Sequence, residues 1–404
     1  MAPNGWNIKT LGNYCEFSQG FQVGVDAQMD SFAEGLVRFV RIVDYTKAFE
    51  PPRYVRKLEN YYLVAKDDLV MVRYGVAGLI CRGIEGVIAN NLFRIKPKEQ
   101  DSDKAYLYTW FEHHQIQISR LAASSTMPAL KFSDLKSLNI VLPPIAEQRK
   151  IAKILSTWDK AISTTERLID NSRQQKKALM QQLLTGKKRL LDDSGKPFEG
   201  EWEEVKLSHF FERVMEKNNG QSKNVVTISA QHGLIRQEEF FKKSVASETL
   251  DNYFILRKGQ FAYNKSYSNG YPVGAIKRLN RYDDAVVTSL YICFQLKDEQ
   301  LASSCFMEQF FESGLLNRGL KKVAAEGGRA HGLLNVKPAD FMSLPMAVPK
   351  INEQQKIASV LTNADKEIEL SEQQLANLKQ EKKALMQQLL TGKRRVKIDD
   401  KEVA

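Results

Sequence analysis

A segment of 46 residues occurs twice in this chain of 404 residues, and the repetition constrains the fold more than any other feature. Residues 145–190 align with residues 351–396 at a constant offset of 206 without a gap, and 26 of the 46 positions are identical. Inside them, the run KKALMQQLLTGK at 176–187 returns unchanged at 382–393. Identity at this level indicates a duplication rather than a shared composition.

Each copy of the repeat is typical of one long helix. It follows a proline (Pro144 or Pro349), contains none, and ends at a glycine (Gly186 or Gly392) placed as a C-cap. Apolar residues recur in alternating steps of four and three, which predicts the seam of a coiled coil. The simplest apolar partner for this stripe is the other copy. The predicted seam comprises Ile151, Leu155, Trp158, Ile162, Leu179 and Leu183 in the first copy, and Ile357, Leu361, Ile368, Leu375, Leu385 and Leu389 in the second.

The two blocks that precede the copies share a layout but little sequence. Each opens on a tryptophan, Trp6 or Trp202, and continues through strand-like runs and glycine-broken loops. A helical stretch follows, at 104–121 or 305–324, then a polar loop and a last strand that runs into proline. We therefore expect blocks over 1–144 and 191–350, helices over 145–190 and 351–397, and a tail over 398–404.

The net charge of +11 and pI of about 9.2 favour an acidic partner such as nucleic acid. The excess lies on the helices, with +7 over 145–190 and +3 over 351–397, while both blocks are almost neutral. The four cysteines form no CxxC pair, which argues against a zinc site or a disulfide framework and suggests a reducing cytoplasm. The sequence shows no secretory signal and no apolar run of membrane-spanning length.

Motifs for catalysis are missing from the sequence. The two Pro-Pro pairs, at 51–52 and 143–144, do not fit the (N/D)PP(Y/F/W) loop of an adenine methyltransferase. No glycine fingerprint for a methyl-donor nucleotide follows a strand, and no GxxxxGK[ST] loop for ATP occurs. The pair His113-His114 is interpreted as a polar helix face. We therefore predict that the chain is not itself an enzyme and holds no metal.

The chain resembles the specificity subunits of type I restriction–modification systems, the HsdS family, over essentially its whole length. Three elements carry the resemblance, and each occurs twice in the same order. One departure is that Pro349-Lys350 stands where the first copy has Pro-Pro. The elements are PPIAEQ at 143–148 and PKINEQ at 349–354, LLTGK at 183–187 and 389–393, and the tryptophans Trp6 and Trp202.

The resemblance implies an α+β fold with two target-recognition domains separated by two long antiparallel coiled-coil helices in a pseudo-twofold arrangement. Each domain would read one half of a bipartite site on double-stranded DNA. The helices would set the spacer and dock two methyltransferase subunits, and two motor-nuclease subunits would complete a restriction enzyme. S-adenosylmethionine, ATP and Mg would be bound by these partner subunits and none of them by this chain.

Side-chain chemistry and position on loops predict the DNA-reading residues. Arg, Lys, Asn, Gln and small polar side chains read base edges, and Lys and Arg bind phosphates. The basic helix ends at 187–189 and 393–395 would either complement the helix dipole or contact phosphates. The candidates are Arg38, Arg41, Arg73, Tyr74, Ser124, Ser125 and Thr126 in the first block, and Asn264, Lys265, Tyr267, Asn269, Tyr271, Arg329 and His331 in the second.

Two other functions remain open at this stage. The chain could be a DNA-binding fragment of a single-chain restriction–methylation enzyme, which would need a catalytic block that this sequence lacks. It could also be a coiled-coil scaffold without a DNA role, which the nearly neutral blocks favour. A DNA footprint with the partner present would discriminate between them.

Overall fold

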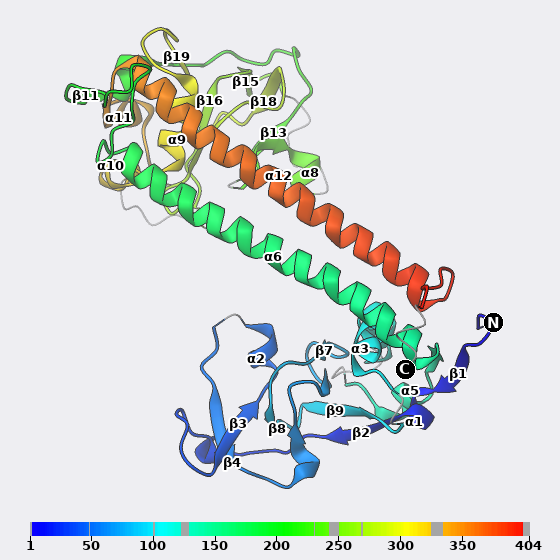
Figure 1. Ribbon diagram of the computed structural model, residues 1–404. Helices are drawn as coiled ribbons and strands as arrows, with labels where there is room; N and C mark the ends of the chain where they lie inside the picture. Colours follow the sequence, from blue (N-terminus) through cyan, green and yellow to red (C-terminus); the bar gives the residue numbers. More distant parts are fainter. Residues whose placement is uncertain are drawn as a thin grey trace. The chain divides into compact units, whose positions relative to one another are not determined.

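The computed structural model describes residues 2–47, 49–99, 102–122, 129–229, 231–241, 250–267, 270–324 and 334–398. Contacts divide the chain into two units, unit 1 with Met1–Glu166 and Gln373–Ala404, and unit 2 with Arg167–Glu372. Two long helices, α6 (Ile145–Leu183) and α12 (Ile351–Leu390), each contribute one half to each unit (Figure 1). Each unit therefore holds one globular block and two helix segments.

Among its described residues, unit 1 has two four-stranded sheets and one two-stranded sheet. Short helices connect the strands (Figure 1). The sheets are β2 (Cys15–Gln19), β9 (Leu92–Pro97), β6 (Leu69–Val72) and β7 (Ile80–Cys81); β4 (Arg53–Arg56), β3 (Leu36–Val40), β8 (Gly86–Ile88) and β5 (Leu63–Val64); and β1 (Asn7–Thr10) with β10 (Asn139–Leu142). The helices are α1 (Leu11–Tyr14), α2 (Val43–Thr46), α3 (Lys104–His113), α4 (Gln115–Ala122) and α5 (Phe132–Lys136), with 3-10 turns η1 (Val25–Ala27) and η2 (Asn60–Tyr62).

The described part of unit 2 has one four-stranded sheet and three two-stranded pairs. They are β12 (Phe211–Arg213), β19 (Ile292–Leu296), β16 (Phe261–Asn264) and β17 (Ala275–Arg278); β13 (Val226–Ser229) with β14 (Gly233–Arg236); β15 (Phe254–Arg257) with β18 (Asp284–Val287); and β11 (Glu203–Lys206) with β20 (Pro345–Val348). The helices are α7 (Leu207–Phe210), α8 (Gln237–Phe241), α9 (Ser304–Glu312), α10 (Asn317–Val323) and α11 (Pro338–Met342).

The two blocks have the same topology although their sequences differ. The order β2-β9-β6-β7 in unit 1 corresponds to β12-β19-β16-β17 in unit 2. The pair β1 and β10 corresponds to β11 and β20, and both pairs are antiparallel. A parallel contact of β3 with β8 has its counterpart in the parallel bridge between Val225 and Val286. The expected α+β fold with two similar blocks and two long helices is therefore confirmed.

The ends of the long helices are part of the globular cores. In unit 1, Ile151 and Leu155 of α6 and Leu389 of α12 belong to the cluster that contains Trp110 of α3. In unit 2, the corresponding cluster contains Leu183 of α6, Ile357 and Leu361 of α12, and Phe310 of α9. Each fully buried leucine or isoleucine stabilises its unit by about 1.5–3 kcal/mol. The apolar stripe thus packs against the recognition blocks as well as against the other helix.

All of the predicted seam residues are buried or partly buried. Ile151, Leu155, Leu183, Ile357, Leu361 and Leu389 are buried, and Trp158, Ile162, Leu179, Ile368, Leu375 and Leu385 are partly buried.

The helical stretch expected in each block is two helices rather than one. In unit 1 the chain turns at His114, between α3 and α4. In unit 2 the break follows α9 at Gly314, whose φ of +76° favours glycine. The pair His113-His114 lies at the turn in unit 1, where α3 ends, and both residues are half-buried. The ring of His114 stacks on that of Trp110, with the ring centroids 4.1 Å apart. The interpretation as a polar helix face was wrong for His114.

Candidate nucleic-acid interface

The repeated motifs meet at a junction in unit 1. Glu147, in the first turn of α6, is buried and accepts hydrogen bonds from Arg395, one of them 2.9 Å long. The guanidinium of Arg395 also lies 5.5 Å from the ring centroid of Trp6. Gly392 ends α12 with φ of +68°, and a Cβ there would lie 3.3 Å from Trp6 and collide with Pro3. Glycine is therefore required at this position by both backbone and packing.

Unit 2 contains the same junction. Glu353 in the first turn of α12 is buried, and Arg189 donates to its two carboxylate oxygens at 2.6 and 2.7 Å. Gly186, with φ of +67°, packs against Trp202, and a Cβ there would lie 3.3 Å from its ring. Each junction joins the start of a block, the start of the helix after it and the end of the other helix.

The glutamine beside each buried glutamate attaches the helix to its block. The side-chain amide of Gln148 donates to the carbonyl of Pro143 at 2.9 Å, and its oxygen accepts from the backbone of Asp103 at 3.1 Å. Gln354 makes the same two bonds: its amide donates to the carbonyl of Pro349 at 2.9 Å, and its oxygen accepts from the backbone of Ser303 at 3.0 Å. The Glu-Gln pair therefore has a structural role in both units.

Ion pairs between the helix segments are duplicated as well. Lys382 lies 2.6 Å from Asp159 in unit 1, and Lys176 lies 2.6 Å from Asp365 in unit 2. Lys176 corresponds to Lys382, and Asp159 to Asp365, because each couple is separated by the repeat offset of 206 residues. Because α6 and α12 exchange roles between the units, each unit pairs the segments antiparallel in the same register. Burial lowers the pKa of Lys382, but hydrogen bonds to Asp159 and Glu112 outweigh it and raise the pKa.

In unit 1, two of the candidate reading residues are held by one buried carboxylate. Arg38 donates to Asp44 at 3.0 Å, and Arg41 donates to Asp44 from its backbone at 2.7 Å and from Nε at 3.2 Å. The side chain of Asp44 has no exposed surface. The sequence Arg41-Ile-Val-Asp44 carries a local signal for this contact, since aspartate three residues ahead can accept a backbone N–H. The two arginines therefore anchor the segment after β3.

The other described candidates of unit 1 lie after β6. Arg73 donates to the side chain of Gln19 at 2.7 Å, and its guanidinium lies 5.1 Å from the ring of Tyr74 and 5.5 Å from that of Phe132. Tyr74 is half-buried and forms a bridge with Ala129. These contacts fix the segment that follows the strand.

In unit 2, the last residue of β16 and the loop after it provide four described candidates. Asn264 accepts a hydrogen bond from the backbone of Ser266 at 3.0 Å. Lys265 accepts from the backbone of Leu334 at 3.0 Å through its carbonyl. Tyr267 is 65% exposed, which makes it the most accessible described candidate. Tyr271 is half-buried and donates to Glu312 at 2.8 Å. The remaining candidates, Ser124, Ser125, Thr126, Asn269, Arg329 and His331, lie outside the described residues.

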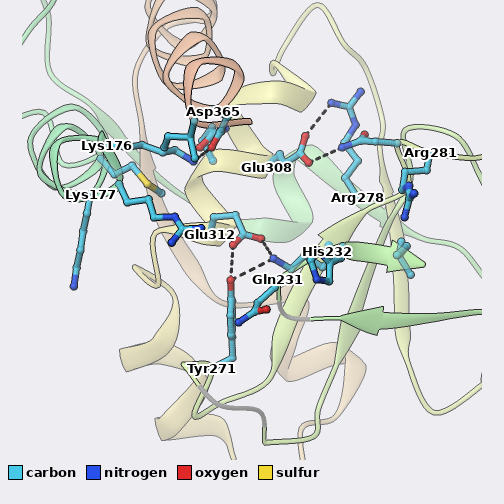
Figure 2. A pocket seen from close by; sticks show the side chains of 18 of the residues that line it. Lys176, Lys177, Gln231, His232, Tyr271, Arg278, Arg281, Glu308, Glu312 and Asp365 are labelled. Atoms are coloured by element: carbon cyan, nitrogen blue, oxygen red, sulfur yellow. Dashed lines mark hydrogen bonds and ion pairs between the residues drawn. The ribbon is translucent and has the colours of Figure 1, made fainter. Parts of the chain in front are cut away.

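An open pocket of about 810 Å³ lies beside this loop in unit 2 (Figure 2). Its cationic side chains come from α6, from β17 and from the turn after it, and most of them face carboxylates. Burial raises the pKa of Glu308, which Arg278 approaches to 3.5 Å. Sequence reasoning overlooked this group because its carboxylates are distant in the chain. The charged lining residues are Arg173, Lys176, Lys177, Lys277, Arg278, Arg281, Glu308, Glu312, Asp365 and Glu372.

In the part of the chain that the structure describes, no group of three or more His, Cys, Asp or Glu side chains could hold a metal ion. Across the same ranges, every helix is too short or too polar to span a bilayer.

Comparisons with known proteins agree with one another. The family model described as the type I restriction modification DNA specificity domain matches residues 3–171 and 199–380. The type I restriction enzyme MjaVIII specificity subunit of Methanocaldococcus jannaschii is 23% identical over 98% of this chain and 94% of its own length. The putative MjaX specificity subunit of the same organism is 27% identical over 76% of this chain and 72% of its own.

Solved structures show the same fold. The crystal structure of a type I restriction–modification S subunit from M. genitalium matches with a TM-score of 0.60 at 14% identity, over 96% of this chain and 99% of that one. A structure on the complex assembly and conformational transition of the type I system matches with a TM-score of 0.55 at 14% identity, over 98% and 100%. With the family model matched in both halves, this chain belongs to the family of type I restriction–modification DNA specificity proteins.

Proposed function

We propose that this chain is the DNA-specificity subunit of a type I restriction–modification complex. One observation carries the proposal: two blocks of the same topology are held by the same junctions but carry different surface residues. The duplicated part suits partners that are alike on both sides. The diverged part suits two different DNA sequences, so each block would read one half of a bipartite site.

The catalytic work belongs to partner subunits in this proposal. Two methyltransferase subunits dock on the helices, and each flips an adenine and takes the methyl group from S-adenosylmethionine. Two motor-nuclease subunits supply ATP-driven cleavage and need Mg. The chain contributes placement, because its two readers and the spacer between them decide which adenines are presented. The assembly would act on cytoplasmic DNA.

Within unit 2, we assign base or backbone contacts to the loop after β16. Its exposed Tyr267 adds little to the stability of the fold and offers an aromatic face and a hydroxyl group to DNA. In unit 1, the segments after β3 and β6 are the corresponding candidates. Their arginines are held by Asp44 and Gln19, so they offer DNA only those guanidinium donors that the protein contacts leave unused.

The direct test is to map methylated bases in a host with and without the gene, with the methyltransferase partner expressed in both. We expect adenine methylation at one bipartite motif only when this chain is present. Purified alone, the chain should transfer no methyl group, cut no DNA and hydrolyse no ATP. Identical methylation in the two hosts, or methyl transfer by the chain without its partner, would refute the proposal.

A further inference from the structure

The loop between β16 and β17 is tied to helix α9 by a three-residue network. The hydroxyl of Tyr271 donates to Oε2 of Glu312, at the end of α9, over 2.8 Å (Figure 2). Lys277 on β17 donates to Oε1 of the same carboxylate. Its Nζ lies 3.3 Å from the Tyr271 hydroxyl and 4.9 Å from the centre of that ring. The network therefore joins the loop, a strand and a helix.

The environment of this network makes it strong. The side chain of Lys277 is 10% exposed and that of Glu312 is 24% exposed, so water competes weakly for either charge. Burial, with the negative charge of Glu312 next, raises the pKa of Tyr271. The hydroxyl therefore remains protonated and keeps donating to the carboxylate at physiological pH.

The end of the same loop is fixed a second time. The hydroxyl of Tyr263 donates to the carbonyl of Val273 at 2.6 Å. Gly274 has φ of +83°, and a Cβ there would lie 2.8 Å from the Tyr263 ring and collide with the Asn264 carbonyl. The segment from Tyr271 to Gly274 is therefore held in place from both sides. The exposed ring of Tyr267 lies in the same loop, four residues before Tyr271.

The corresponding glutamate of unit 1 does something else. Glu112 has the same place in α3 as Glu312 has in α9, nine residues after the helix N-caps Asp103 and Ser303. Glu112 accepts from Lys382 of α12 at 2.8 and 2.9 Å. The shared scaffold thus does not require this residue to bind a loop, and the contact with Tyr271 is a property of unit 2.

In unit 2 the scaffold role passes to another residue. Gln309 of α9 donates to Asp365 of α12 at 2.8 Å, and Asp365 also pairs with Lys176, the counterpart of Lys382. The tie between block and helices is therefore maintained without Glu312, which leaves its carboxylate available for the loop.

We propose that Lys277 and Glu312 are positioning residues for DNA recognition: they hold the segment from Tyr271 to Gly274 in one conformation at the half-site that unit 2 reads, the second half-site. This inference rests on the proposed function. A segment that is held in one conformation before binding loses less conformational entropy on binding, and it meets a wrong base with the same fixed geometry. Affinity and discrimination at one half-site should then depend on residues that touch no DNA.

The test uses the complex of the full chain with its methyltransferase partner. Tyr271→Phe removes the donor and keeps the ring, and Glu312→Gln keeps the shape and removes the charge. The control is Tyr291→Phe, which removes a buried hydroxyl 3.4 Å from Thr227 in the same unit. Methylation rates are measured on the natural site and on sites with one changed base in either half.

We expect both variants to lose discrimination on the order of tenfold at the second half-site, since each disrupts a hydrogen bond to a charged group. Glu312→Gln also leaves Lys277 without its carboxylate, so the double variant should lose no more than Glu312→Gln alone, because Tyr271→Phe then removes nothing further. The first half-site, the salt dependence of binding and the Tyr291→Phe control should match the wild type. Phosphate contacts set that salt dependence, and none is removed.

Two results would overturn the inference: wild-type discrimination in both variants, or an equal loss at both half-sites, which would indicate general destabilisation. The proposed function is judged separately on the unaltered complex. If the wild type itself shows no preference at either half-site, the assignment as a specificity subunit fails and this inference fails with it.

Discussion

The guanidinium of Arg189, just beyond the end of α6, holds the buried carboxylate of Glu353 in the first turn of α12 through two hydrogen bonds of 2.6 and 2.7 Å. The arginine side chain is 24% exposed and the glutamate side chain 2% exposed. Loss of Arg189 therefore has different consequences from loss of Glu353. An unpaired Arg189 can reach water, whereas an unpaired Glu353 remains buried with its charge.

We predict that Arg189→Met destabilises the chain by about 3–5 kcal/mol, the usual cost of an uncompensated buried charge. Glu353→Leu in the same chain should recover much of that loss, because no buried charge is then left. Denaturant unfolding of the single and double variants measures both effects. Lys356→Met is the matched control, since its partner Asp193 is 97% exposed and such pairs contribute about 0–1 kcal/mol. A loss in the control as large as in Arg189→Met would argue against the special role of the junction.

The helices could be predicted from sequence because their signals are local. The heptad stripe, the preceding proline and the terminal glycine all lie within the repeat, and α6 and α12 begin at Ile145 and Ile351. The motifs around Glu147 and Gly392 could also be recognised in the sequence, but the contacts that they make could not be predicted from it. Glu147 and Arg395 are 248 residues apart, and no local pattern indicates that they touch.

The candidate site was less accessible to sequence reasoning for the same reason. Tyr271 could be chosen for its chemistry and its loop, but its hydroxyl is bound to Glu312, 41 residues away. Arg38 and Arg41 are an exception to this reason: both are predicted DNA-reading residues, and the Asp44 that holds them is close in sequence. Charge and loop position predict where polar groups are, and the fold decides which of them are already occupied.

We predict that Tyr267→Ala weakens recognition of the second half-site only. Tyr267 is 65% exposed, so loss of its ring should change the stability of unit 2 little. If it contacts a base, the cost should be about 1–3 kcal/mol for the half-site that it reads. Methylation-site mapping shows whether one half of the motif relaxes while the other holds. Equal relaxation of both halves would contradict independent reading by the two blocks.

The stability of unit 1 should fall in mild acid. Burial lowers the pKa of both His113 and His114, and for His114 a hydrogen bond with the Trp110 carbonyl opposes the shift in part. Their folded pKa values lie below the ordinary value of about 6.5, so the unfolded chain takes up protons first as pH falls. The stability that depends on these neutral rings is fully present above the unfolded pKa of about 6.5. It is lost as the pH falls from there through the pKa values of the folded chain.

Replacing one of these rings tests that dependence. Asn at position 114 can still donate to the Trp110 carbonyl but does not titrate. Denaturant unfolding at pH 7.5 and 5.5 should therefore show a smaller drop in stability for His114→Asn than for the wild type. A drop of the same size in both proteins would mean that other groups cause the acid sensitivity.

The last prediction concerns the spacer of the DNA site. Each long helix passes from one unit to the other, α6 between Glu166 and Arg167 and α12 between Glu372 and Gln373. Inserting four residues at both points leaves the ion pairs of each unit in register, including Lys379 with Glu166 and Arg173 with Glu372. An insertion in α6 alone shifts the register of one helix against the other and serves as the control.

If the helices set the spacing, the double insertion should lengthen the gap between the half-sites and leave both half-site sequences unchanged. Four residues add roughly 6 Å of helix and turn it about 400°, a full turn plus about 40°. Translation alone matches nearly two base pairs at about 3.4 Å each, whereas the excess rotation matches one pair at about 35°. Local unwinding can absorb part of a four-residue change of heptad phase, so we expect a gap one base pair longer. Methylation mapping in cells measures the gap, and the single insertion should reduce assembly instead. An unchanged gap at full activity in the double insertion would show that these helices do not determine the spacing.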